Sequence, residues 1–92
     1  MSFREELKKD YESVKAMLED LEAQLKDVEK RISELESKYR KSSREFLEDR
    51  SGVSEEEREE WLGLIHYRDN LRRGLEPLRQ QIESLSGMFE NP

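Results

Sequence analysis

Apolar residues recur at alternating spacings of four and three along most of the chain, and this repeat restricts the fold more than any other feature. The first array runs Leu7, Tyr11, Val14, Leu18, Leu21, Leu25, Val28, Ile32, Leu35, Tyr39, Ser42 and Phe46. A seam with this period is typical of an α-helix that buries one stripe against another helix. We therefore predict a first helix over about residues 3–49.

A second array with the same period follows a short polar segment. Its members are Trp61, Leu64, Arg68, Leu71, Leu75, Leu78, Ile82, Leu85 and Phe89. Between the arrays, Gly52 can end a helix in the left-handed conformation, and Ser54 followed by Glu57 has the spacing of a capping box. The pattern predicts a turn over 50–53 and a second helix over about 54–89.

Gly74 and Pro77 disturb the second predicted helix, because proline lacks a backbone donor and crowds the carbonyl four residues earlier. The heptad phase continues across both residues, whereas a loop would shift it. We expect a kinked but continuous helix, with two separate helices as the alternative.

A short turn between two long amphipathic helices predicts an antiparallel hairpin, in which the two seams face each other. Matching the arrays end to end defines a register with the opposed pairs Ser42–Trp61, Tyr39–Leu64, Leu35–Arg68 and Leu25–Leu78. The ion pairs expected beside this seam are Glu29–Arg72 and Glu22–Arg79. The chain is thus predicted to be one all-α domain over residues 1–92, an antiparallel two-helix coiled-coil hairpin.

The composition favours a binding protein over an enzyme. Charged residues make up 43% of the chain and the net charge is -6, whereas binding to a nucleic-acid backbone needs basic surface. One histidine, no cysteine and no glycine-rich phosphate loop lead us to expect no catalytic residues, no cofactor and no metal site. Since neither a bilayer-length apolar run nor a signal-peptide core is apparent, we expect a cytoplasmic protein without membrane contact.

Apolar residues that the predicted seam does not use are candidates for a protein interface. The first group is Phe3, Leu7 and Tyr11, beyond the reach of the second array. The second group is Phe46, Leu47, Trp61, Leu62 and Ile65, around the turn. The first group could serve self-association, docking on another protein or a frayed end, and the second could serve local packing or a partner patch.

These features predict a non-enzymatic protein-protein interaction module, a coiled-coil scaffold or an assembly adaptor. The expected partners are a second copy, a basic protein, or both. Charges along the first helix permit an antiparallel dimer in which Lys8 faces Glu36 and Lys15 faces Glu29. That dimer would compete for the seam unless a four-helix assembly of two hairpins shares it.

Three stretches near the turn carry a resemblance: Leu35-Glu36-Ser37-Lys38-Tyr39, Ser42-Ser43-Arg44-Glu45-Phe46-Leu47-Glu48 and Glu59-Glu60-Trp61. Over positions 35–73 the chain resembles short helical antitoxin-like proteins of prokaryotes. In that group a Lys-Tyr-Gly-Met-Ser-Ser-x-Glu-Phe-like stretch ends a long helix, and a Glu-Trp opens the next. Here Arg40 and Lys41 replace the Gly-Met pair.

The resemblance implies a protein that neutralises a small toxin by covering a basic partner with an apolar and acidic face. A further alternative is an acidic nucleic-acid mimic, suggested by the acidic run over 54–60 and by the overall charge. Salt dependence distinguishes mimicry from an apolar helical interface, because electrostatic binding is screened by salt.

Overall fold

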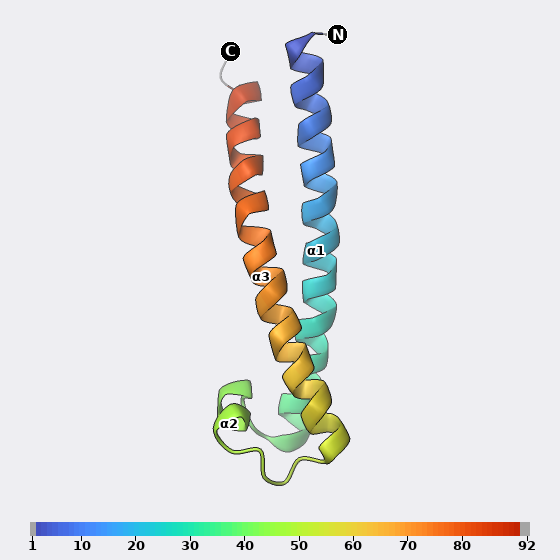
Figure 1. Ribbon diagram of the computed structural model, residues 1–92, viewed down its shortest axis with the longest axis vertical. Helices are drawn as coiled ribbons and strands as arrows, with labels where there is room; N and C mark the ends of the chain where they lie inside the picture. Colours follow the sequence, from blue (N-terminus) through green and yellow to red (C-terminus); the bar gives the residue numbers. More distant parts are fainter. Residues whose placement is uncertain (1, 91–92) are drawn as a thin grey trace.

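Two long antiparallel helices packed side by side form the body of the molecule, as Figure 1 shows for this computed structural model. The structure describes residues 2–90, with side chains through residue 88. Helix α1 spans Phe3–Tyr39, α2 spans Ser43–Glu48 and α3 spans Glu55–Glu90. The short α2 lies at the closed end, the two chain ends lie at the open end, and the molecule measures 61 × 19 × 16 Å. The predicted all-α hairpin is therefore confirmed.

The first helix is shorter than predicted, because it ends at Tyr39 rather than near residue 49. Arg40 adopts the left-handed conformation (φ 54°, ψ 42°), and the backbone N–H groups of Arg40 and Lys41 both donate to the carbonyl of Glu36. A left-handed residue closes a helix in this way and turns the chain out of the helical path. The heptad pattern carried no sign of this ending.

A complete capping box starts α2 and makes the segment 43–48 a separate helix. The hydroxyl of Ser42 accepts from the backbone N–H of Glu45 at 3.1 Å, and the Glu45 carboxylate accepts from the backbone N–H of Ser42 at 3.4 Å. Ser42 therefore occupies a helix start, where its side chain satisfies an otherwise unpaired donor. Phe46 belongs to α2 and not to the seam of α1.

Only half of the capping box predicted at Ser54 forms. The Ser54 hydroxyl accepts from the backbone N–H of Glu57 at 3.3 Å, whereas the Glu57 carboxylate accepts from side chains of α1 instead of reaching back to the Ser54 backbone. Gly52 has a positive φ of 81°, but it lies within the connector between α2 and α3 and ends no helix.

Helix α3 passes through Gly74 and Pro77 without a break, as the continuous heptad phase predicted. Pro77 is exposed and lies away from α1, so the carbonyl that loses its hydrogen bond can be reached by water. Figure 1 shows that the axis of α3 leans across α1 near the closed end and turns more nearly parallel to it toward the open end.

The two long helices are opposed one heptad away from the predicted register. Tyr39, expected opposite Leu64, donates a hydrogen bond of 2.7 Å to Glu57, which lies one heptad earlier on α3. Leu35 likewise shares a buried cluster with Trp61, one heptad before its predicted partner. The shift follows from the early end of α1, because α3 can then begin beside Tyr39.

The flank that carries Glu22 and Glu29, here named the Arg72 flank, does not distinguish the two registers. Arg72 Nη2 lies 3.4 Å from Glu29 Oε1, and Arg79 Nη2 lies 3.8 Å from Glu22 Oε1, so both predicted ion pairs are present. Each residue on this flank lies between two possible partners one heptad apart. The same pairs therefore fit the predicted and the observed register.

The opposite flank, here named the Tyr67 flank, does distinguish them. The Tyr67 hydroxyl donates to Gln24 Oε1 at 2.6 Å, and Arg31 Nε donates to Glu60 Oε2 at 2.8 Å. In the predicted register Gln24 would face residue 81 and Arg31 would face residue 74. The flank contacts and the Tyr39 hydrogen bond thus agree on the shifted register.

Two clusters of buried residues follow one another along the hairpin, and Val14, Leu75 and Leu85 are buried outside them. The cluster at the closed end contains Leu35, Phe46, Val53, Trp61 and Ile65, and the next contains Val28, Ile32 and Leu71. Towards the open end the seam is less tightly covered, since several of its members are only partly buried, among them Leu7, Leu18, Leu78 and Ile82. Among the described residues, no helix is long and apolar enough to cross a membrane.

Candidate protein-interaction surfaces

Residues 36–61 at the closed end are named the elbow here. A stack of aromatic rings fixes the positions of its helices. The rings of Phe46 and Trp61 are 4.1 Å apart between centroids and nearly parallel, with an interplanar angle of 4°. Tyr39 lies on the Trp61 ring system at 6.1 Å. Both Phe46 and Trp61 are fully buried, so α2 is held against α3 by the largest apolar side chains of the chain.

Buried polar groups in the elbow are paired. The indole N–H of Trp61 donates to the Ser43 hydroxyl at 3.0 Å, and the backbone N–H of Ser43 donates to Glu36 Oε2 at 2.7 Å. This chain of bonds links α3, α2 and the last turn of α1. Because a buried indole N–H without a partner is destabilising, Ser43 makes the position of Trp61 specific.

Glu57 is the electrostatic centre of the elbow. Its carboxylate accepts from the Lys38 ammonium and from the Tyr39 hydroxyl, and both hydrogen bonds lower the pKa of Glu57. The same carboxylate raises the pKa of Lys38. Arg31 Nη2 lies 3.8 Å from the second oxygen. The first turn of α3 is thereby tied to the last turns of α1.

A two-bond contact joins Arg31 to Glu60 one turn further along α3. Arg31 Nε and Nη2 each donate to one Glu60 oxygen at 2.8 Å, which is the paired geometry that suits a guanidinium and a carboxylate. The contact lowers the pKa of Glu60, and together with Glu34 it raises the pKa of Arg31. These carboxylates are used within the chain.

The connector between α2 and α3 is also fixed in place. The Lys41 ammonium donates to the backbone carbonyls of Asp49 at 3.0 Å and Ser51 at 2.8 Å. The Asp49 carboxylate accepts from the backbone N–H of Ser51 at 3.0 Å, which lowers the pKa of Asp49. Val53 is buried in the elbow core. The elbow therefore presents one defined surface.

The structure changes the assignment of the interface residues predicted around the turn. Phe46, Trp61 and Ile65 are buried, which agrees with local packing, one of the two roles predicted for them, and leaves them no exposed surface in this hairpin for a partner patch. Leu62 is partly buried against the same core, and Leu47 remains 45% exposed. The sequence pattern could not separate these roles, because α2 was not expected as a separate helix.

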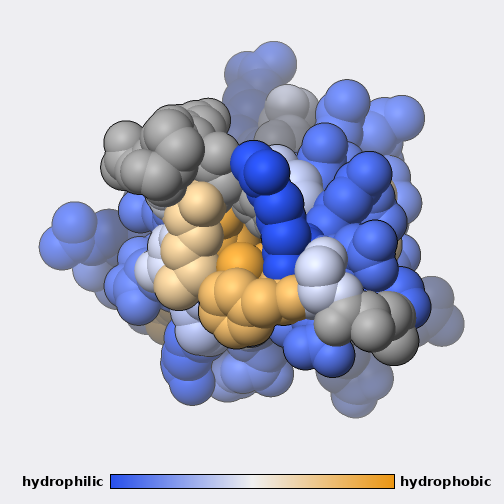
Figure 2. All heavy atoms as spheres, turned by 90° about the horizontal axis from the view of Figure 1, so that it is seen from above, coloured by the Kyte–Doolittle hydropathy of each residue, from blue (hydrophilic) through white to orange (hydrophobic). Residues whose placement is uncertain are grey.

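The predicted apolar stripe at the open end also contains residues that differ in exposure. Phe3 is 75% exposed, whereas Leu7 and Tyr11 are partly buried. In the observed register Tyr11 lies opposite the buried Leu85, so the seam extends further along α1 than predicted. Figure 2 looks onto the open end and shows apolar atoms exposed there among hydrophilic side chains.

Three exposed apolar residues that sequence reasoning did not select lie on the Tyr67 flank. Met17, Tyr67 and Met88 are 55%, 45% and 57% exposed. Met17 precedes Gln24 by one heptad on α1, and Met88 follows Tyr67 by three heptads on α3. Both methionines therefore lie on the same side of the hairpin as the contact between Gln24 and Tyr67. Phe3 falls on the same line. Their common heptad position was the signal that could have identified them.

Both carboxylates proposed for a dimer through the first helix are used inside the hairpin. Glu29 pairs with Arg72, and Glu36 accepts from Ser43. Arg68 Nε lies 3.3 Å from Asp69 Oδ1 on its own helix. A dimer that uses the α1 seam would have to displace α3.

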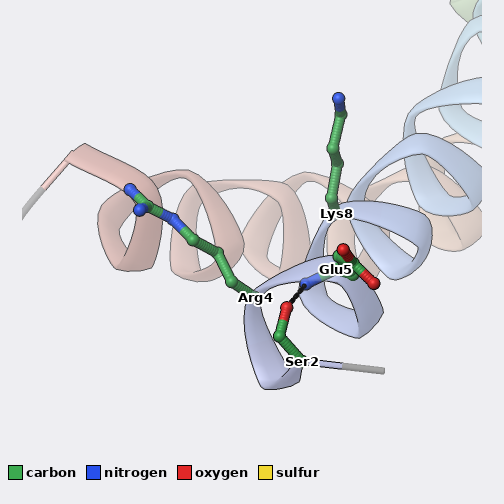
Figure 3. A pocket seen from close by; sticks show the side chains of 4 residues that line it. All are labelled: Ser2, Arg4, Glu5 and Lys8. Atoms are coloured by element: carbon green, nitrogen blue, oxygen red, sulfur yellow. Dashed lines mark hydrogen bonds between the residues drawn. The ribbon is translucent and has the colours of Figure 1, made fainter.

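The start of α1 forms an open pocket, drawn in Figure 3, that is lined by Ser2, Arg4, Glu5 and Lys8. The Ser2 hydroxyl accepts from the backbone N–H of Glu5 at 3.3 Å and caps the helix. All four residues are exposed and come from the N-cap and the first two turns of α1, so the pocket is part of the helix start. Among residues 2–90, no cluster of three or more His, Cys, Asp or Glu side chains could hold a metal ion.

No protein-family model, curated protein or solved structure matches this chain.

Proposed function

We propose that this chain is a non-enzymatic protein-binding module whose main contact surface is the Tyr67 flank. The observation that carries the proposal is the distribution of exposed apolar residues. Among the described side chains five large apolar ones are exposed, and four of them lie on this flank at heptad-related positions: Phe3, Met17, Tyr67 and Met88. In a chain with 43% charged residues, such a line indicates an interface, whereas isolated exposed apolar residues need no explanation.

The rigidity of the elbow supports this proposal. The aromatic stack and the Glu57 contacts fix the register, and the register determines which residues of α1 and α3 share the flank. A surface that is organised before binding loses less conformational entropy on association. We therefore favour an assembly or scaffold role over a function that needs a mobile site.

The test is a binding comparison between two charge variants. Met17→Glu with Met88→Glu adds carboxylates to the Tyr67 flank, whereas Leu47→Glu adds one to the elbow, and all three positions are exposed. After confirming unchanged helicity by circular dichroism, each protein is immobilised and exposed to a lysate of the source cells. We expect the flank variant to lose proteins that the wild type and the elbow variant retain. Equal retention by all three would refute the assignment of the flank.

A second candidate, an antitoxin-like inhibitor of a small basic protein, is supported by one backbone feature. Arg40 has φ 54°, a conformation that glycine adopts most easily, and the antitoxin-like stretch has glycine at this position. The exposed Leu47 and the carboxylates of Glu55 and Glu59, which make no polar contact with the described residues, would supply the apolar and acidic contact surface. Here Leu47→Glu, and not the flank variant, should abolish binding.

An acidic nucleic-acid mimic has less support. Glu57 and Glu60 lie within the acidic run that suggested it, and both are engaged by cations of α1. Measuring retention of the captured proteins at low and moderate salt tests this candidate directly. Mimicry would lose binding over that range, whereas contacts through the Tyr67 flank should persist.

A further inference from the structure

An uncharged stripe runs along one exposed face of α3, and it shares Tyr67 and Met88 with the Tyr67 flank. Its members are Gly63, Tyr67, Asn70, Gly74, Pro77, Gln81, Ser84 and Met88, and all of them are exposed. They follow one another at spacings of four and three, so they form a second heptad seam beside the one that packs on α1. In a chain with 43% charged residues, the absence of charge from these eight positions calls for a physical reason.

Three members of the stripe disfavour a helix, and the hairpin gives no reason for them. A Cβ atom added at Gly63 would meet nothing within 4 Å, and one added at Gly74 would meet only Leu21 Cδ1, at the ordinary contact distance of 4.0 Å. Alanine would therefore fit at both positions and favour the helix. Pro77 costs the helix a hydrogen bond on the same side. Local choices that oppose the fold tend to mark functional surfaces.

The stripe is complementary to itself when reversed. A two-fold axis between Gly74 and Pro77 sets Gly63 against Met88 of a second copy, and Tyr67 against Ser84. Each of these pairs joins a large side chain to a small residue, so volume is shared across the contact.

The same axis sets Asn70 against Gln81 of the second copy, where the two amides can exchange hydrogen bonds. Gly74 and Pro77 then meet at the centre, where the absence of long side chains allows the helices to approach closely. The stripe covers about 38 Å of helix at 1.5 Å per residue.

We propose that this stripe binds the same stripe on a second copy, giving a two-fold dimer of hairpins with α3 against α3 in antiparallel orientation. Both α1 seams stay covered by their own α3, so dimerisation does not open the hairpin. Gln24 contacts Tyr67, and Met17 lies one heptad before Gln24 on the same face of α1. The exposed Met17 therefore borders the stripe and adds apolar area to the contact. The inference deepens the proposed function by naming one partner of this side of the molecule.

The decisive experiment is sedimentation equilibrium of the full chain with a pair of isosteric variants. Gln81 lies in the stripe and the neighbouring Gln80 lies outside it, and both are exposed. Gln81→Glu puts a carboxylate into the contact and should raise the dimer Kd at least ~10-fold, whereas Gln80→Glu should leave it within about 2-fold. A wild-type chain that stays monomeric at millimolar concentration, or an equal effect of the two variants, would overturn the dimer.

A charge exchange tests the orientation. Asn70→Lys should weaken the dimer alone, and Asn70→Lys with Gln81→Glu should restore it, because each lysine then faces a glutamate of the other copy. Failure of the double variant to recover would overturn the antiparallel pairing.

Gly74→Ala should raise the Tm at dilution, where the monomer dominates, and still weaken the dimer. A purely structural role of Gly74 would not give this opposite pair of effects.

These outcomes are separable from those of the proposed function. A monomeric chain that still retains other proteins through the Tyr67 flank would overturn the dimer and leave the binding module intact. A chain that dimerises through the stripe but retains nothing else through the flank would leave self-association as the only binding activity.

Discussion

The Tyr39 hydroxyl donates to Glu57 across the hairpin at 2.7 Å, and this bond joins the last residue of α1 to the first turn of α3. It forms only when the helices are opposed in the observed register. Together with the Lys38 contact to the same carboxylate, it makes Glu57 the residue on which the alignment of the two helices most directly depends.

The alignment predicts how a thiol crosslinker will react with this cysteine-free chain. Leu25 and Leu71 pack in the same cluster, so the Leu25→Cys/Leu71→Cys variant should crosslink efficiently within a monomer. The Leu25→Cys/Leu78→Cys variant, which corresponds to the register expected from the heptads alone, should crosslink poorly. Mass spectrometry of the monomer band after a short reaction measures both yields. A higher yield for the second variant would contradict the observed register.

Stability should fall in acid. The pKa values of Glu57, Glu60 and Asp49 are all lowered in the folded chain, so their contribution is complete above the ordinary carboxylate pKa, which is 4.5 for Glu, and is lost as the pH falls through the folded values. We expect the urea midpoint to decrease between pH 5 and about pH 2. Glu57→Gln should reduce this dependence, whereas Glu12→Gln, at an exposed position, should leave it unchanged. A wild-type midpoint that stays constant over this range would contradict the assignment.

Loss of the Ser43 hydroxyl should destabilise the elbow. Ser43→Ala leaves the buried indole N–H of Trp61 without its partner, at a cost of about 1–3 kcal/mol. Trp61 is the only tryptophan, so its fluorescence during urea unfolding reports the change directly. Ser33→Ala, at an exposed position of α1, is the matched control and should change stability by less than about 0.5 kcal/mol. Equal effects of both variants would show that the bond contributes nothing.

Truncation of Phe46 should have a larger effect. Phe46→Ala removes one ring of the stack from a fully buried site, and such changes cost about 3–5 kcal/mol. Because marginal domains are stabilised by about 5–15 kcal/mol, α2 should detach or the chain should unfold at a much lower urea concentration. Leu47→Ala, at the exposed neighbour, should be nearly neutral by the same fluorescence measurement. A near-neutral Phe46→Ala would indicate that α2 is not part of the core.

Glycine at position 40 should stabilise the protein relative to alanine there. Arg40 holds a left-handed conformation that costs a residue with a Cβ atom about 1–2 kcal/mol. Arg40→Gly should therefore unfold at a higher temperature than Arg40→Ala, by an amount that calorimetry resolves. The reverse order would mean that α1 does not end at this residue.

Much of the fold follows from the sequence because a heptad repeat reports directly on the face that each helix buries. Two long helices, their antiparallel arrangement and the passage of α3 through Pro77 were all predictable. The repeat is periodic, however, so it cannot distinguish registers that differ by one heptad. The ion pair between Glu29 and Arg72 fits both of these registers.

The details that were missed depend on contacts between segments distant in sequence. The packing of Phe46 from α2 on Trp61 compensates for the left-handed conformation of Arg40. A heptad pattern does not indicate this contact between distant segments. The sequence therefore left Phe46, Trp61 and Ile65 open between local packing and a partner patch, and the structure shows that they are buried. Met17 and Met88 share a heptad position that could have identified them, but only the observed register places them in line with the contact between Gln24 and Tyr67.

The elbow fixes the alignment of two helices whose apolar pattern otherwise repeats every seven residues. Shortening or loosening the segment 40–54 would let one helix slide along the other by a whole repeat, with its seam still apolar and some of its ion pairs intact. Such a slide would change the neighbours of every residue up to the far end of a molecule 61 Å long. A few residues at one end therefore decide which side chains the other end displays.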